Sequence, residues 1–223
     1  NTENVQKIMG KFTSDYTRLF VKSKEGEINH ILDYNGITIV ITNYELEVIS
    51  TLEIPNAGDK LIFVDSLNNG INLVSKKLDN SYQYFSISPE NTINYEKSFS
   101  LDTNITLTNI KSVNENLILL HGFYYDKVNK TTYAYFAKYR PLDNTLQDTI
   151  LSSRKDIRKL ERVSNSLFAA IGQSRGRQGY LLLDTNLHQI KDIRVDSLTG
   201  EIKDMIFHNK KIALNFASLE ADR

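Results

Sequence analysis

One pattern recurs five times along this chain: a short strand, a polar turn rich in asparagine, and then a strongly apolar strand. The copies are "HILDYNGITIVIT" (30–42), "IFVDSLNNGINLVS" (62–75), "NIKSVNENLILLHG" (109–122), "KLERVSNSLFAAIG" (159–172) and "DMIFHNKKIALNFA" (204–217). Asparagine and glycine tolerate the left-handed backbone of tight turns, so each copy predicts a β-hairpin. Regular self-similarity of this kind constrains the fold more strongly than any other feature of the sequence.

The spacing of the copies matches a known class of repeat. The apolar strands begin near Ile37, Ile71, Leu117, Leu167 and Ile212, at intervals of 34, 46, 50 and 45 residues. In the three middle copies a third strand follows ("YQYFSIS", "TTYAYFAKY", "GYLLLD"), and then a more polar fourth strand ("INYEKSFSL", "LQDTIL", "IKDIRVD"). Units of ~40–50 residues with four strands resemble the blades of a β-propeller, of the WD40-like kind but without the WD signature, because the chain has no tryptophan.

We therefore expect an all-β fold, a β-propeller or propeller fragment of about five four-stranded repeats. The expected repeats are residues 28–55, 60–102, 105–151, 155–196 and 201–217. Residues 1–27 are expected to hold a short helix (2–10) and a strand (16–23) that would complete the last blade, and residues 218–223 a tail or truncated end. A two-sheet sandwich is the alternative, and "SSRKDIRKLERV" (152–163) is also compatible with a helix.

Composition narrows the classes of function. Lysine plus arginine and aspartate plus glutamate both number 27, and zero net charge argues against wholesale binding to nucleic acid or to an anionic membrane. The absence of cysteine excludes thiol catalysis, disulfides and cysteine-based zinc sites. No apolar run reaches the ~20 residues of a transmembrane helix. The chain starts without methionine, and we favour an exported protein over a cytoplasmic one, with a trimmed domain as the other explanation.

The segment "GQSRG" (172–176) matches the G-x-S-x-G pattern of a hydrolase nucleophile elbow. That elbow needs a strand before the serine and a helix after it. Here "RQGYLLLD" follows Ser174 and predicts another strand, so we expect no catalytic residue at this loop. The four histidines lack metal-ligand spacing, so we expect no metal and no cofactor.

Basic residues are concentrated around the same loop. Seven lie between positions 154 and 177 and only two acids oppose them, which gives a local charge of +5. This predicts either a solvated face or a docking surface for an acidic protein partner, with nucleic acid as a weaker third interpretation. The seven are Arg154, Lys155, Arg158, Lys159, Arg162, Arg175 and Arg177.

Tyrosines are concentrated on one expected hairpin, "HGFYYDKVNKTTYAYFAKYRP" (121–141). Strand alternation places Tyr133, Tyr135 and Tyr139 on one face, and Tyr124 lies on the preceding strand. Such tyrosines are either cross-strand packing pairs or contact residues of a binding surface.

Together these features predict a non-enzymatic interaction module, a scaffold or assembly factor that binds a protein partner through its loops. The partner-binding candidates are the seven basic residues and the four tyrosines. The alternative is a propeller hydrolase, or a protein that binds carbohydrate or another small ligand at a central channel, where His121 at a strand end is the first residue to consider.

Overall fold

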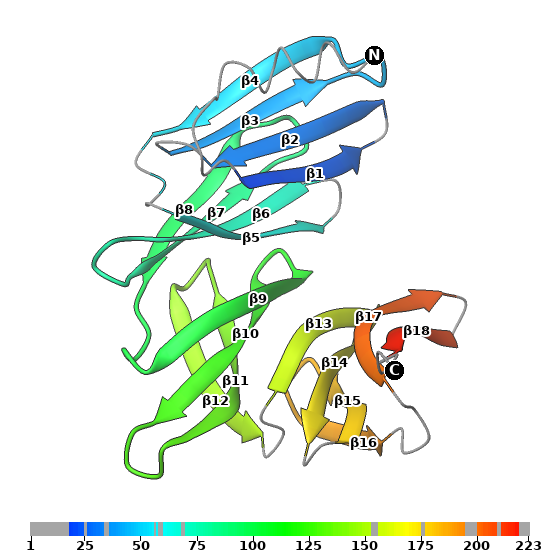
Figure 1. Cartoon of the computed structure of the whole chain (residues 1–223). Helices are drawn as coiled ribbons and strands as arrows, with labels where there is room; N and C mark the ends of the chain where they lie inside the picture. The colour runs from blue at the N-terminus through cyan, green and yellow to red at the C-terminus, as the bar shows by residue number, and fades with distance from the viewer. Residues whose placement is uncertain are drawn as a thin grey trace, which may run out of the picture. The chain divides into compact units, whose positions relative to one another are not determined.

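The computed structural model is all-β: its described residues form eighteen strands and no helix (Figure 1). The described residues are 18–24, 26–33, 36–55, 57, 60–67, 70–152, 156–174, 177–194, 200–208 and 211–218. The helix expected at residues 2–10 lies outside them. The chain divides into two compact units, Asn1–Ser100 and Leu101–Arg223. No helix in the described residues is long and apolar enough to span a membrane.

The first unit contains two four-stranded antiparallel sheets, each built from consecutive strands. Sheet 1 consists of β1 (Arg18–Lys24), β2 (Glu27–Asp33), β3 (Ile37–Thr42) and β4 (Val48–Ile54). Sheet 2 consists of β5 (Lys60–Leu67), β6 (Gly70–Lys76), β7 (Tyr82–Ile87) and β8 (Ile93–Phe99).

The second unit continues the same up-and-down arrangement. Sheet 3 consists of β9 (Ile105–Asn114), β10 (Leu117–Asp126), β11 (Thr131–Arg140) and β12 (Thr145–Ser152). Sheet 4 consists of β13 (Asp156–Ser164), β14 (Leu167–Ser174), β15 (Arg177–Asp184) and β16 (Gln189–Arg194). In the described residues sheet 5 has two strands, β17 (Gly200–His208) and β18 (Lys211–Ser218). Four antiparallel strands in sequence order are the architecture of a propeller blade.

Sheet 1 begins earlier than the first expected repeat. Residues 16–23 were expected to complete the last blade, but Arg18–Lys24 pairs with β2 as the first strand of sheet 1. The second strands of the five sheets begin at Glu27, Gly70, Leu117, Leu167 and Lys211, at regular intervals of 43, 47, 50 and 44 residues. The short interval of 34 residues in the sequence arose because the recurring pattern falls on β2 and β3 in sheet 1, but on the first two strands of the other sheets.

In the helix-compatible segment 152–163, residues 156–163 form part of strand β13 instead. Two β-bulges interrupt its pairing with β14, one between Ile157 and Lys159 and one between Arg162 and Ser164. A bulge inserts an extra residue and shifts the alternation of side chains. Ile157 and Leu160 are therefore both buried although they are three residues apart, which imitates the periodicity of a helix.

Neighbouring sheets within each unit pack face to face on apolar side chains. The core between sheets 1 and 2 includes Ile31, Ile39, Ile41, Leu61, Leu73, Phe85 and Ile87. The core between sheets 3 and 4 includes Leu119, Ala134, Phe136, Leu160, Phe168, Leu181 and Leu183. Burial of one such aliphatic or aromatic side chain contributes about 1.5–3 kcal/mol, so these contacts are the main stabilising term in each unit.

Gly122 lies where β9 and β10 approach most closely, at a β-bulge between His121 and Gly122. A Cβ atom at this position would overlap the carbonyl oxygen of Thr106 and lie 2.9 Å from the Cα of Leu107. Both obstacles are backbone atoms of the paired strand, so they cannot move aside as a flexible side chain would.

We predict that Gly122→Ala lowers the free energy of unfolding by roughly 2–4 kcal/mol, because β9 must separate from β10 to admit the methyl group. Urea denaturation followed by circular dichroism measures this change. Thr132→Ala, on the neighbouring strand β11, is the matched control and is expected to cost less than about 1 kcal/mol. A loss below about 0.5 kcal/mol for Gly122→Ala would contradict the close approach of these strands.

Candidate interaction sites

The β10–β11 hairpin carries the four candidate tyrosines on one face. Its register pairs Tyr124 with Tyr133, Gly122 with Tyr135, and Ile118 with Tyr139, which confirms the expected shared face of the three tyrosines of β11. Tyr135 and Tyr139 are buried, whereas Tyr124 and Tyr133 keep part of their surface exposed. Of these four tyrosines, the Tyr124–Tyr133 pair therefore presents most of the exposed surface, and Tyr125, next to Tyr124 on β10, is 45% exposed.

Tyr139 has a structural role in sheet 3. Its hydroxyl donates a hydrogen bond of 2.8 Å to Oδ1 of Asn144, in the turn between β11 and β12. Burial raises the pKa of Tyr139 to about 12, so the phenol stays protonated and remains a donor.

The tip of this hairpin is a fixed turn with an apolar residue at its apex. Oδ1 of Asp126 accepts the backbone N–H groups of Val128 (2.9 Å) and Asn129 (3.1 Å), and Oδ2 accepts the Asn129 side-chain amide (2.7 Å). These hydrogen bonds hold the pKa of the Asp126 carboxyl below its usual range, with those from Asn129 as the largest cause. Val128 is 90% exposed, between the exposed Lys127 and Lys130.

The strand directions bring several connections of the second unit to one end. β12 ends at Ser152, which pairs with Ala134 in the first half of β11. β13 begins at Asp156, opposite Gln173 and beside the β14–β15 turn. The intervening residues 153–155 cannot separate these two strand ends by more than about 14 Å, because each residue extends the chain by at most ~3.6 Å.

The term "basic end" is used below for this end of sheets 3 and 4, which includes the turn residues 127–130 and the strand ends at Ser152, Asp156, Ser174 and Arg177. Of the seven predicted basic residues, the structure places Arg177 at this end. Arg154, Lys155 and Arg175 lie outside the described residues, and Arg177 begins β15 opposite Ser174. The strand expected after Ser174 is therefore present as β15, in place of the helix that a nucleophile elbow requires.

The other three predicted basic residues lie on β13, the first strand of sheet 4. Arg158 and Lys159 occupy its first half. Arg162 donates a hydrogen bond of 3.1 Å to the carbonyl of Val113 on β9, and its guanidinium carbon lies 5.9 Å from the centre of the Phe168 ring. Arg162 therefore joins sheet 4 to sheet 3.

A second contact supports the same junction between β9 and β13. The ammonium of Lys111 lies 3.3 Å from a carboxylate oxygen of Glu161. Both side chains are about four-fifths buried. Part of the basic segment thus contributes to packing between sheets.

His121 is fully buried between sheets 3 and 4. Its Nδ1 lies 3.1 Å from the hydroxyl of Thr108, and its ring lies 5.0 Å from that of Phe136 and 5.9 Å from that of Phe123, measured between centroids. Nε2 has no hydrogen-bond partner in the part of the chain that the structure describes. Desolvation lowers the pKa of His121 to about 3, so the ring is neutral in the folded protein.

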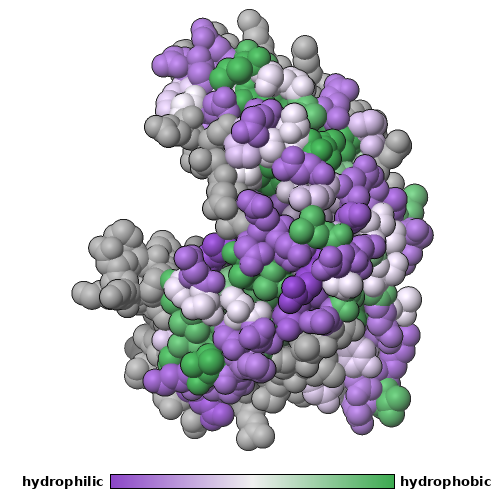
Figure 2. Space-filling model, turned by 180° about the vertical axis from the view of Figure 1, so that it is seen from behind, coloured by the Kyte–Doolittle hydropathy of each residue, from purple (hydrophilic) through white to green (hydrophobic). Residues whose placement is uncertain are grey.

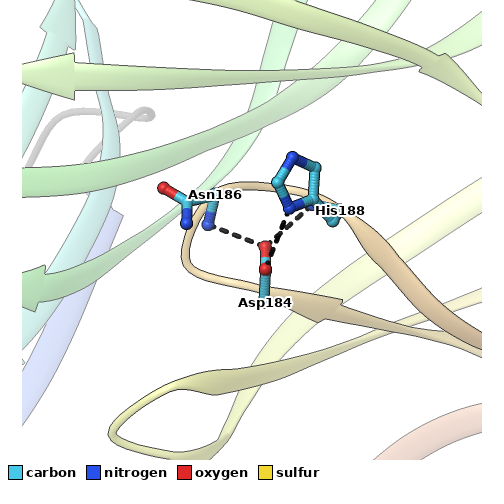
Figure 3. Close-up of polar contacts among 3 residues, drawn as sticks. All are labelled: Asp184, Asn186 and His188. Atoms are coloured by element: carbon cyan, nitrogen blue, oxygen red, sulfur yellow. Dashed lines mark hydrogen bonds and ion pairs between the residues drawn. The ribbon is translucent and has the colours of Figure 1, made fainter.

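The β15–β16 turn of sheet 4 contains an aspartate–histidine pair (Figure 3). Oδ1 of Asp184 accepts the backbone N–H groups of Asn186 and His188, both at 2.8 Å, and Oδ2 lies 3.1 Å from Nδ1 of His188. Among the described residues no three histidine or carboxylate side chains form a metal-binding group. We interpret the pair as part of the hydrogen bonding that stabilises the turn.

The residue that sequence reasoning missed at this end is Val128. The segment "DKVNKT" was recognised as a hairpin tip, and Lys127 and Lys130 flank the valine in sequence. Its exposure follows from the capping by Asp126, because that turn directs the residue after Lys127 away from both strands.

Comparison with known proteins supports the fold and leaves the family open. No protein-family model and no curated protein matches the chain. The structure is similar to the β-propeller domain of the Trilobed protease from Pyrococcus furiosus, described as having an open velcro topology, with 8% identity and a TM-score of 0.58. That similarity covers 92% of this chain and 79% of the other.

Two further similarities extend to longer proteins. The Dos1 propeller matches with 11% identity and a TM-score of 0.53, over 85% of this chain and 49% of that one. Oligopeptidase B from Leishmania major matches with 8% identity and a TM-score of 0.55, over 98% of this chain and 31% of that one. The chain thus spans about half of the first protein and less than a third of the second. At these identities the comparisons establish a β-propeller fold alone, and the all-β prediction is confirmed.

We predict that His121 makes stability depend on pH below about 6.5. In the unfolded chain His121 binds a proton with its ordinary pKa of 6.5, whereas burial in the folded chain lowers the pKa of His121 to about 3. Stability from this group is therefore complete above pH 6.5 and declines as the pH falls towards 3, by up to roughly 1 kcal/mol per pH unit.

Urea denaturation between pH 7 and pH 4 compares the wild type with His121→Phe, which places an apolar ring between two phenylalanines. The slope of stability against pH should be shallower in this variant. Thr132→Ala, which leaves every titratable group in place, should retain the wild-type slope. Equal slopes for all three proteins would show that His121 is not held neutral by burial.

Proposed function

We propose that the protein is a non-enzymatic interaction module whose basic end binds an acidic segment of a protein partner. The observation that supports the proposal is the placement of strand ends: β12 ends at Ser152 beside the first half of β11, and β13 begins at Asp156 opposite Gln173, on the same side as the start of β15 at Arg177. Basic residues neighbour these strand ends in the sequence and flank Val128 in the β10–β11 turn. Binding residues of rigid β-scaffolds are usually located on such loops.

The charges at this end support an acidic partner. The β10–β11 turn contributes the exposed Lys127 and Lys130, and the neighbouring sequence contributes Arg154, Lys155, Arg175 and Arg177. Nearby acids include Asp126 and Asp102, whose carboxylates accept hydrogen bonds within their turns, and Asp156. Clustered positive charge in a neutral protein accelerates encounter with an acidic surface.

An apolar contact adds to this electrostatic attraction. Val128 is held at the apex by hydrogen bonds within the turn, so little conformational freedom is lost when a partner covers it. Tyr124 and Tyr133 lie next to the tip as a cross-strand pair. We propose these residues as the apolar part of the contact, and Tyr135 and Tyr139 as the packed support beneath them.

The hydrolase or ligand-binding alternative depended on a site at a channel. His121 was its first candidate residue, and the structure buries this side chain between sheets 3 and 4. No other described group favours that alternative, so we retain the interaction module.

The proposal predicts that the double variant Arg175→Glu, Arg177→Glu binds a fluorescein-labelled peptide of ten glutamates at least about tenfold more weakly than the wild type. Fluorescence anisotropy at low salt measures the affinity. Val128→Asp should weaken binding as well, because it places a negative charge at the centre of the contact.

The matched control is the double variant Arg140→Glu, Lys191→Glu, which makes the same change of charge at two exposed positions of sheets 3 and 4 away from the basic end. It should retain affinity within about threefold. An equal loss in both double variants would show that net charge alone attracts the peptide. Unchanged affinity in the Arg175 and Arg177 variant would refute the basic end as a binding surface.

A further inference from the structure

The first unit contains a long acidic stretch that the second unit lacks. Residues 25–59 include no lysine or arginine, although 27 such residues occur in the chain. The same stretch has seven acids: Glu25, Glu27, Asp33, Glu45, Glu47, Glu53 and Asp59. The stretch forms β2, β3 and β4 of sheet 1. Glu27 and Asp33 of β2 pair with Lys24 and Arg18 of β1, so the acidic part without basic residues is β4 and the turn before it, which carry Glu45, Glu47 and Glu53.

Strand β4 is the outer strand of this acidic part. In the described residues it pairs only with β3, so its other edge offers unpaired backbone groups. Ile41 pairs with Ser50 and Thr42 with Val48, so Ile49 is the extra residue of a β-bulge at the start of β4. Val48 (55%) and Ile49 (53%) are both exposed there. Tyr44, in the turn before β4, is 61% exposed. Figure 2 likewise shows hydrophobic side chains at the surface of the molecule among hydrophilic ones.

The outer strands of sheets 2 and 4 are protected in a way that β4 is not. Strand β8 carries Glu96 and Lys97 near its middle, and β16 carries Lys191, Asp192 and Arg194. Charged side chains on an edge strand prevent pairing with other chains. The sequence of β4 is "VISTLEI", and its one charge, Glu53, lies near its end.

We propose that β4 binds an extended, basic segment of a partner protein, which adds to sheet 1 as a further strand. Backbone hydrogen bonds at the open edge would supply affinity, and alternate side chains would supply specificity. Apolar residues of the segment would cover Val48 and Ile49, and its lysines or arginines would face Glu45, Glu47 and Glu53. This surface lies in the first unit and does not depend on the basic end.

The charges favour a basic partner over a second copy of this chain. Two β4 strands paired with each other would bring two acidic stretches together, and like charges across an interface oppose association. A single added strand buries a small area, so we expect a weak, transient complex that dissociates as salt is raised.

The test uses the full chain and an eight-residue fluorescein-labelled peptide of alternating valine and lysine. Fluorescence anisotropy should show saturable, salt-sensitive binding to the wild type. Ile49→Lys should weaken it at least about tenfold, because it replaces an exposed apolar side chain of the edge strand with a charge that repels the basic peptide. Ile93→Lys makes the same change at another exposed outer-strand isoleucine, in sheet 2, and should leave the affinity within about threefold.

A second peptide separates strand addition from simple charge attraction. N-methylation of alternate backbone amides keeps the charge but removes donors, so this peptide should bind at least about tenfold more weakly. Absence of binding to the wild type, equal binding of both peptides, or unchanged affinity in Ile49→Lys would overturn the proposal. So would self-association of the wild type, measured by sedimentation, that Ile49→Lys abolishes.

Discussion

Face-to-face packing between neighbouring sheets is the interaction on which the rest of each unit depends. A four-stranded sheet has two faces and cannot bury either of them alone. In the second unit Leu119 and Phe136 of sheet 3 pack with Phe168 and Leu183 of sheet 4. The middle strands are therefore apolar on both faces, and the polar fourth strands remain at the outer edge.

This packing determines which residues remain for binding. Side chains along the strands are used for packing, as the buried Tyr139 and His121 illustrate, or to join sheets, as Arg162 does by its hydrogen bond to Val113. Binding groups are left at the turns and along the outer strands. The two surfaces proposed above follow this division: Val128 belongs to a turn, and Ile49 belongs to an outer strand.

Much of the architecture could be predicted from the sequence because turn residues and strand period are local signals. The repeated hairpins, the polar fourth strands and the shared tyrosine face are of this kind. The sequence could not show which strands of sheet 1 carry the first copy of the recurring pattern. A short strand, an asparagine turn and an apolar strand describe β2 and β3 of sheet 1 as well as the first two strands of the other sheets. The bulges of β13 could not be predicted either, because they interrupt the alternation of apolar and polar residues from which strands are predicted.

Burial was harder to predict than strand position. Tyr133 and Tyr135 are alike in sequence and share a face, yet only Tyr135 is buried, because exposure depends on the distance from the turn. The basic segment was predicted as one surface, but Arg162 bonds to another sheet whereas Arg177 lies at the end. The apolar residues of β4 resemble those of a buried strand, and only the order of strands places them at an edge.

The central claim is that this β-propeller chain binds partners at a turn and at an outer strand of opposite charge. Hydrogen-exchange mass spectrometry of the full chain, with the acidic peptide and the basic peptide added in separate experiments, tests it most directly. The account predicts that the acidic peptide slows exchange at residues 127–130 and 175–177 and the basic peptide slows it at Val48–Ile54. Slowed exchange at the same residues with both peptides, or at neither region, would contradict it.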